Sequence, residues 1–429
     1  MNKHQLKNKI LAIEQIPLLL FSIKWLLIAI LVGSLAGSAS AFFLISLDYV
    51  TELREFNMWV IALLPLSGLI IGLTYHYWGS NVLKGNNQLL EEFYSPKQVI
   101  PFRMAPLVLF GTLMTHLFGG SAGREGTAVQ MGGAIADQFT KVFRLRPRDR
   151  KMLIIMGISA GFASVFGTPI AGAIFALEVL IMGRMRYEAI LPTFMAAYIA
   201  DYTCHLWGAA HTSYTIYEVP AMDPLNFLLS IAAGILFGIT ALIFSRSTHF
   251  FTQLFSKKFS YPPIRPLIGG VVIAGVVFLS DNTRYLGLGI PIIINAFEEQ
   301  VLPYDFLLKI LFTAFTLGAG FKGGEVTPLF FIGACLGNTL VWLIPLPISL
   351  LAGMGFVAVF SGATNTPIAC TMMAIELFGA ESALYTAIAC VVSYLFSGHN
   401  SIYGSQIIGS PKHLLYGRYK SKQINAIKK

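Results

Sequence analysis

The sequence has little charge. Only 12% of its 429 residues are Asp, Glu, Lys or Arg, whereas 55% are hydrophobic, and the mean hydropathy is +0.68. A soluble protein needs far more polar surface to face water, so the composition excludes a soluble enzyme or binding domain. Apolar runs of helical length recur at 25–49, 58–77, 152–182 and 227–244, among others. Because about 20 such residues span a bilayer, we predict an all-α polytopic membrane protein. We expect about ten to eighteen helices in the lipid bilayer, several too short to cross it.

Cysteine and histidine are also scarce. The four cysteines show no Cys-x-x-Cys spacing, and the eight histidines form no pair typical of metal ligands. The sequence contains no Gly-x-Ser-x-Gly motif, no His-Glu-x-x-His motif and no paired aspartates in an apolar run. We therefore expect no metal site and no cofactor, and we predict that the chain is not an enzyme.

The formal net charge is +9, and the basic residues are concentrated in a few segments. Lys3, Lys7 and Lys9 precede the first apolar run, six basic residues lie within 141–151, and five lie within 418–429. By the positive-inside rule, both termini and the 141–151 connection face the cytoplasm, with the chain in the plasma membrane. Basic clusters can also bind nucleic acid, but no soluble domain is present to carry such a site, so we expect no nucleic acid partner.

Two pairs of segments match each other at nearly one spacing. Residues 168–178 share Thr-Pro-Ile-Ala, and later Ala and Glu, with residues 366–376, an offset of 376 − 178 = 198. Gly-Arg-Glu-Gly-Thr at 123–127 aligns with Gly-Gly-Glu-Val-Thr at 323–327, an offset of 325 − 125 = 200. Two independent matches at similar offsets indicate an internal repeat. Repeated halves with interrupted helices are typical of transporters whose site lies where the halves meet.

We therefore divide the chain into two transmembrane repeats with short flanking segments. The predicted parts are a cytoplasmic N-terminal segment at 1–24, a first repeat at 25–205, a second repeat at 225–410 and a short basic cytoplasmic tail at 411–429. In the first repeat, Gly33 and Gly37 form a Gly-x-x-x-Gly pair. This pair predicts that the helix carrying it packs closely on a neighbouring helix.

Glycine-rich segments interrupt the apolar pattern at matching places in the two repeats, at 118–127 and 318–328. Their small residues predict a break, with a new helix beginning directly afterwards. Pro328 suits the first turn of such a helix, where its missing N–H leaves no hydrogen bond unmade. A helix that begins inside the membrane presents free backbone N–H groups and the positive end of its dipole. Such an end binds an anion without a cationic side chain, so we predict an anion site here.

Each interrupted segment carries a glutamate, Glu125 in the first repeat and Glu325 in the second. A glutamate carboxylate at a helix N-terminus can occupy the site of a transported anion, and protonation releases it. We therefore predict that Glu125 gates the site and couples it to protons. The alternative is a plain capping carboxylate, which the helix dipole favours by about 0.3–1 kcal/mol. For Glu325 the residues alone leave both roles open.

These residues resemble the signatures of the CLC family of chloride channels and anion/proton exchangers. Gly-Arg-Glu-Gly-Thr at 123–127 is similar to the family's GREGP motif, and Gly-Glu-Val-Thr-Pro at 324–328 is similar to its GxFxP motif. The similarity extends from about residue 25 to residue 410. It implies the CLC fold, in which two inverted-topology repeats of tilted and broken helices form a homodimer with one pore per subunit.

Departures from the usual motifs point to a subgroup. Asn86 stands where the family usually has serine, Thr127 where it has proline, and Val326 where it has phenylalanine. This combination is similar to the fluoride/proton antiporters of the bacterial CLC branch, which implies a bacterial protein that exports fluoride in exchange for protons. The amide of Asn86 offers two donors where serine has one. The resemblance implies an anion site made of Asn86, Gly126, Thr127, Glu325, Val326, Thr327 and Tyr403.

The proton route departs from that of the chloride/proton exchangers in this family. They carry a second, internal glutamate where this chain has Val179. The resemblance therefore makes Glu325 the candidate for a substitute group that handles protons or binds the ion. A chloride/proton exchanger or a passive anion channel of the same fold stays open as an alternative. We expect Glu178 and Glu376, which are repeat partners, to be buried groups that pair within the fold or across a helix end.

Overall fold

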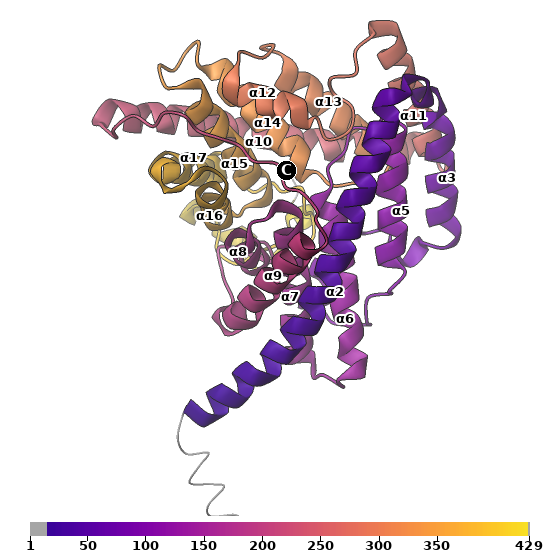
Figure 1. Cartoon of the computed structure of the whole chain (residues 1–429), viewed down its shortest axis with the longest axis vertical. Helices are drawn as coiled ribbons and strands as arrows, with labels where there is room; N and C mark the ends of the chain where they lie inside the picture. Colours follow the sequence, from indigo (N-terminus) through magenta and orange to yellow (C-terminus); the bar gives the residue numbers. More distant parts are fainter. Residues whose placement is uncertain (1–14, 428–429) are drawn as a thin grey trace, which may run out of the picture.

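The computed structural model describes residues 15–427, which form sixteen α-helices labelled α2 to α17, short 3-10 helices and one small sheet (Figure 1). The predicted all-α membrane architecture is confirmed. Among the described residues, three helical segments are long and apolar enough to cross a membrane by length and composition, namely Gln15–Phe56, Met58–Tyr77 and Pro224–Lys258. The other apolar helices are shorter, as expected for a protein with many interrupted helices. The lysines at 3, 7 and 9 lie outside the described residues.

The two predicted repeats contain eight α-helices each. The first contains α2 (Gln15–Phe56), α3 (Leu64–Tyr77), α4 (Asn86–Tyr94), α5 (Met104–Leu117), α6 (Glu125–Val142), α7 (Pro147–Phe166), α8 (Pro169–Glu178) and α9 (Ile190–Leu206). The second contains α10 (Pro224–Lys258), α11 (Ile264–Ser280), α12 (Ile290–Glu298), α13 (Asp305–Gly318), α14 (Val326–Leu340), α15 (Ile348–Thr364), α16 (Pro367–Phe378) and α17 (Ala383–Phe396). Strands β1 (Ile181–Met182) and β2 (Ile407–Ile408) pair in parallel. The pairing joins the connection between α8 and α9 to the segment after α17.

The helices of one repeat pack as their partners do in the other. α2 packs on α9 as α10 packs on α17, and α6 packs on α7 as α14 packs on α15. Where the repeats meet, Gly123 and Gly324 form an antiparallel bridge. Equivalent segments that pair in antiparallel fashion are related by a two-fold axis through the bridge, which is the geometry of inverted repeats. Thus the inverted topology, which the repeat alone did not determine, is present in the structure.

Glycines allow the closest helix crossings. Gly132 of α6 faces the backbone of Gly157 in α7, and Gly333 of α14 faces the backbone of Gly355 in α15, with no space for a Cβ atom between the helices. The predicted packing of Gly33 and Gly37 is also confirmed. Both lie against α9, where the backbone of Ala200 abuts Gly37. Small residues let helix backbones approach in this way, which is how helices associate where burial from water cannot drive them together.

Glu178 and Glu376 cap each other's helices across the repeat boundary. The carboxylate of Glu376 accepts hydrogen bonds from the N–H groups of Ile170 (2.9 Å) and Ala171 (2.7 Å), at the start of α8. In turn, Glu178 accepts from Ile368 and Ala369, at 3.2 and 2.9 Å, in the first turn of α16. Each carboxylate thus satisfies unpaired donors of a helix N-terminus and complements its dipole. The expected pairing across helix ends is confirmed.

Helix α2 is already formed at Gln15, the first described residue, ten residues before the predicted start of the first repeat at residue 25. The residues before Lys24 are also largely apolar, and no glycine or proline after Pro17 interrupts the helix there, so it continues past this charge. In Figure 1, α2 is the long indigo helix whose first turns extend beyond the other helices. Most of the large side chains on these turns are exposed, including Leu18, Leu19 and Leu20.

A buried cluster of charged side chains holds the connection between α4 and α5 against α6 and α7. The Arg150 guanidinium donates to both carboxylate oxygens of Asp137, at 2.8 and 2.7 Å, and to Glu92 at 3.1 Å. It also donates to the carbonyl of Gln98 at 2.6 Å, and Asp137 accepts from the N–H of Ile100 at 2.8 Å. These bonds fix the 95–100 stretch against α6 and α7.

Replacing Arg150 with methionine should destabilise the fold by about 3–5 kcal/mol, because two carboxylates are left without their counterion. The measurement is the unfolding midpoint in detergent micelles. Arg148→Gln is the matched control, since this neighbouring arginine is exposed and its loss should change stability by less than about 0.5 kcal/mol. Equal midpoints for the two variants would show that the cluster does not hold the connection.

Candidate anion site between two helix N-termini

Two helices begin beside each other inside the protein, one from each repeat. α6 begins at Glu125 and α14 at Val326, both near the end of the predicted interrupted segments. Their approach is fixed by reciprocal bonds, in which the N–H of Gly123 donates to the carbonyl of Gly324 at 2.7 Å and the reverse bond measures 2.6 Å. The positive ends of two helix dipoles therefore meet at one place.

Each interrupted segment is also anchored on a helix of the other repeat. The N–H of Ser121 donates to the hydroxyl of Thr316 in α13 at 3.3 Å. The N–H of Lys322 donates to the hydroxyl of Thr115 in α5 at 3.3 Å. Because α5 and α13 are repeat partners, these contacts are related by the same two-fold axis. Each repeat therefore helps to hold the helix start of the other in place.

The Glu125 carboxylate lies between the two helix starts and is fully buried. One of its oxygens accepts from the N–H of Arg124 and from the N–H of Thr327, both at 3.1 Å. The other accepts from the Thr327 hydroxyl, and it lies 3.8 Å from Nε of Arg124. A carboxylate with this many donors is bound as an anion would be bound. Thr327, a predicted anion ligand, therefore lies beside Glu125 and contributes two donors.

Two further N–H groups at these helix starts remain available. Within residues 15–427, no protein acceptor takes the N–H of Gly126 or that of Val326. Both belong to the first turn of a helix, where the intrahelical acceptor is missing. They were predicted as anion ligands, and the structure leaves them free to serve in that role.

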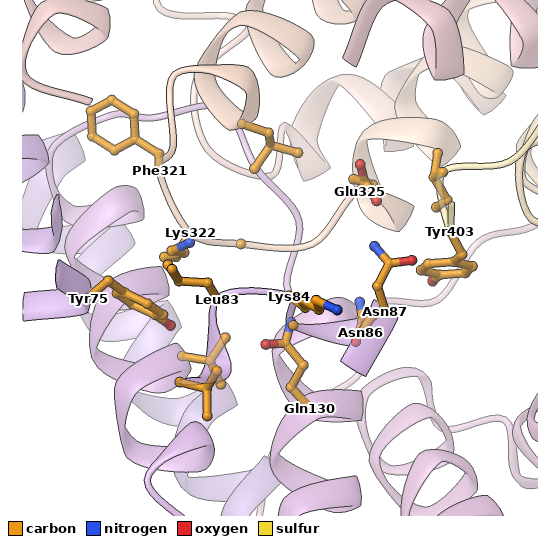
Figure 2. A pocket seen from close by; sticks show the side chains of 16 residues that line it. Tyr75, Leu83, Lys84, Asn86, Asn87, Gln130, Phe321, Lys322, Glu325 and Tyr403 are labelled. Atoms are coloured by element: carbon orange, nitrogen blue, oxygen red, sulfur yellow. The ribbon is translucent and has the colours of Figure 1, made fainter. Parts of the chain in front are cut away.

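A cavity of about 180 Å³ lies next to the helix starts and is lined by both repeats and by the segment after α17 (Figure 2). In this view Glu325, Asn86 and Tyr403 lie toward one end, and Lys322 and Tyr75 lie toward the other. The polar lining residues are Tyr75, Lys84, Asn86, Asn87, Gln130, Lys322, Glu325 and Tyr403. Three predicted site residues, Asn86, Glu325 and Tyr403, therefore line the cavity. Glu125 lies between the helix starts instead.

Asn86 connects the cavity with the N-terminus of α6. A Cβ atom placed on Gly126 would lie 3.1 Å from the Asn86 amide nitrogen, so this amide reaches the first turn of α6. The Asn86 side-chain oxygen is buried and has no hydrogen-bond partner among the described residues. Asn86 is also the first residue of α4, and its neighbour Gly85 has a φ of +53°, which favours glycine.

Thr127 points elsewhere in this conformation. Its hydroxyl bonds the hydroxyl of Thr112 at 2.6 Å, and its N–H donates to the carbonyl of Arg124 at 3.1 Å. The hydroxyl and the N–H of Thr127 are therefore both bonded to protein groups. Its role as an anion ligand stays a prediction.

Sequence reasoning missed the residues that position Tyr403 and that set the charge of the cavity. Asn87 accepts from the N–H of Ser405 at 2.9 Å, which ties the Tyr403 segment to the start of α4. The Lys322 ammonium lies over the Tyr75 ring, 4.2 Å from its centre, as a cation–π pair. Lys322 could have been noticed as the one cation in its glycine-rich segment. The contact of Asn87 joins residues 318 positions apart, and nothing local indicates it.

Arg124 is a buried cation beside Glu125. Its side chain is 8% exposed, and Nε has no hydrogen-bond partner within the described part of the chain. The guanidinium lies 3.8 Å from the Glu125 carboxylate, and its charge attracts anions to the helix starts. Among residues 15–427, no group of three or more His, Cys, Asp or Glu side chains could hold a metal ion. The site is therefore built from backbone N–H groups, hydroxyls, an amide and one guanidinium, all suited to an anion.

Comparisons with known proteins agree with this architecture. The chain is 53% identical over 406 residues to the chloride/fluoride channel protein of Pseudomonas syringae pv. tomato, which covers 93% of this chain and 90% of that protein. The crystal structure of a CLC-type fluoride/proton antiporter superposes with a TM-score of 0.87 at 36% identity, covering 90% of this chain and 98% of that one.

A slow cyanobacterial Cl⁻/H⁺ antiporter matches with a TM-score of 0.75, over 87% of this chain and 94% of that one. At 19% identity this likeness shows the fold alone. The family model described as voltage gated chloride channel matches residues 67–398, which include both interrupted segments. The chain therefore belongs to the voltage gated chloride channel (CLC) family.

Proposed function

We propose that the chain is a fluoride/proton antiporter that exports fluoride from the cytoplasm, with Glu125 as its gate. The observation that carries the proposal is the Glu125 carboxylate bound by donors of both helix starts. The choice of fluoride is supported by the relatives, one described as a chloride/fluoride channel protein and another as a CLC-type fluoride/proton antiporter. Asn86, which the subgroup resemblance singled out, supports it further because its amide reaches the α6 terminus.

The mechanism follows from competition for the same donors. An ionised Glu125 carboxylate holds the N–H and hydroxyl of Thr327, so a fluoride ion that enters this place must displace it. Protonation removes the charge that holds the side chain there. A cycle in which fluoride and the carboxylate alternate at the helix starts, with the carboxylate leaving as its protonated form, exchanges fluoride for protons.

Glu325 supports the cytoplasmic half of this cycle. It follows Gly324 at the start of α14 and lines the cavity, apart from Glu125. The Glu325 carboxyl group can accept a proton from the cavity. It would thereby take the role of the internal glutamate, whose position is occupied by Val179 in this chain. Lys322 and Lys84 line the same cavity and raise the local concentration of anions.

The proposed setting is the plasma membrane of a bacterium, with both termini in the cytoplasm and two copies of the chain forming a homodimer. The described basic segments 141–151 and 418–427 support the orientation. Lys24, in the first turns of α2, pairs with Asp149 in the first turn of α7 at 2.7 Å, which places both on one side of the membrane.

The test is a flux measurement on the whole protein in proteoliposomes, with fluoride and pH electrodes recording together. A fluoride gradient should drive protons in the opposite direction, and the reversal potential should depend on the pH gradient. Chloride in place of fluoride should drive little proton movement. Equal rates for the two anions would favour a chloride/proton exchanger, and a reversal potential independent of pH would favour a passive channel.

Asn86→Ser should weaken the preference for fluoride by about tenfold, because one of the two amide donors at the α6 start is lost. The measurement is the ratio of fluoride to chloride flux. Asn81→Ser is the control, since this exposed asparagine lies outside the cavity lining. A ratio unchanged in Asn86→Ser would show that the amide does not select the ion.

A further inference from the structure

The first turns of α2 and the connection from α6 to α7 enclose a groove of about 710 Å³. Its walls are apolar and include Leu27 and Leu31, which are 59% and 42% exposed. Its edge carries Lys24, Arg144 and Arg146. The basic residues at 144 and 146 thus lie beside an apolar groove. This groove is separate from the cavity at the anion site.

The groove lies at one boundary of the membrane. Between Lys24 and Asp48, helix α2 has 47 − 24 = 23 residues without an acidic or basic side chain. At 1.5 Å per residue, this stretch is about 34 Å long, close to the thickness of the hydrocarbon core. Lys24 therefore lies at the level of the lipid head groups, and Leu27 and Leu31 follow it into the hydrocarbon.

The backbone at Arg144 is strained for an arginine. Arg144 has a φ of +48°, and it follows α6 in the left-handed conformation that usually takes glycine there. The hydrogen bonds of this helix end are complete, with the N–H of Leu145 donating to Thr140 (3.0 Å) and that of Arg144 donating to Lys141 (3.2 Å). Glycine would make the same bonds without strain, so the helix end itself does not require the arginine side chain.

Arg146 is also unfavourably placed in the absence of an anion. It is the residue that precedes the first turn of α7, where the helix dipole is positive and a cation is repelled. Among residues 15–427, Lys24 is the one of the three groove cations with an acidic partner, Asp149, at 2.7 Å. Arg144 and Arg146 are both exposed, and together they leave the groove positive.

We propose that this groove binds one anionic phospholipid of the membrane. Its phosphate lies between Arg144 and Arg146, where it compensates both guanidinium groups. One acyl chain lies along Leu27 and Leu31. A lipid fits better than the N-terminal segment of the chain itself, because residues 1–14 carry three lysines and one glutamate and would be repelled. Basic pockets between helices at the cytoplasmic boundary suit such head groups.

The test measures binding of phosphatidylglycerol to the whole purified protein by native mass spectrometry, with phosphatidylcholine as the neutral lipid. Phosphatidylglycerol should bind more tightly, and the double variant Arg144→Gly/Arg146→Gln should weaken this binding by about 30-fold. Arg148→Gln, an exposed arginine of the same connection outside the groove, should leave it unchanged. Equal loss in Arg148→Gln, or equal affinity for the neutral lipid, would overturn the proposal.

Two further measurements separate lipid binding from folding and from simple anion binding. Arg144→Gly alone should raise the unfolding midpoint in lipid-free detergent while reducing lipid affinity by about fivefold, because strain and the ligand are lost together. An unchanged affinity in this variant would contradict the assignment. Inorganic phosphate should not displace the lipid at matched concentration, since it lacks the chain that fills the groove; displacement would show a site for free anions instead.

Discussion

Glu125→Gln should abolish fluoride-driven proton transport. The glutamine side chain keeps the shape of glutamate but neither carries the negative charge that competes with fluoride nor exchanges a proton. Removal of a positioned group that transfers protons lowers rates by about 10²–10⁴-fold, so proton movement should fall to the background of empty vesicles. Fluoride flux that remains in the variant should be passive and independent of the pH gradient. The measurement is simultaneous recording of fluoride and proton flux in proteoliposomes.

Glu52→Gln is the matched control for this experiment. Glu52 is an exposed carboxylate of α2 outside the described site, so its neutralisation should leave both fluxes and their ratio unchanged. The unfolding midpoint of Glu125→Gln should be recorded beside the flux, because a folded but uncoupled protein is the expected outcome. Proton movement driven by fluoride at the normal rate in folded Glu125→Gln would contradict the assignment of the gate.

Local sequence features predicted the helix starts well. The glycines before Glu125 and before Val326, and the proline at 328, indicate where a helix breaks and the next begins. Both helices begin within the predicted segments, three residues earlier than a start directly after them. The repeat predicted that Glu178 and Glu376 behave alike, and each caps the partner's helix. Such features are visible because they depend on residues close together in the chain or on positions related by the repeat.

Contacts between distant residues were not visible in this way. The Thr327 hydroxyl reaches Glu125 across 202 positions, and the sequence suggested Thr327 only through the family resemblance. The repeat also suggested equal places for Glu125 and Glu325, yet one lies between the helix starts and the other lines the cavity. Glu125 is the first residue of α6, whereas Glu325 precedes the first turn of α14. This difference depends on tertiary packing that no local pattern specifies.

Gly324→Ala should reduce fluoride transport by about 100-fold. A Cβ atom on Gly324 would lie 2.7 Å from the backbone nitrogen of Gly126 and 3.2 Å from that of Glu125, closer than a methyl group can approach. The start of α6 must therefore move away from that of α14. Charge-assisted hydrogen bonds are worth about 1.5–3 kcal/mol each, so separating the donors weakens the shared anion site by about two orders of magnitude. The measurement is initial fluoride flux, with affinity from its concentration dependence.

Gly275→Ala makes the same chemical change where it should do no harm. Gly275 lies in α11, and a Cβ atom there would have no neighbour within 4 Å, so alanine adds only helix propensity, worth about 1 kcal/mol. Transport should be normal and the unfolding midpoint equal or higher. The pair tests whether the anion site depends on the close approach of two helix starts rather than on glycine content. Normal fluoride affinity in Gly324→Ala would show that one helix start alone binds the ion, and Glu125 would then gate a site within α6.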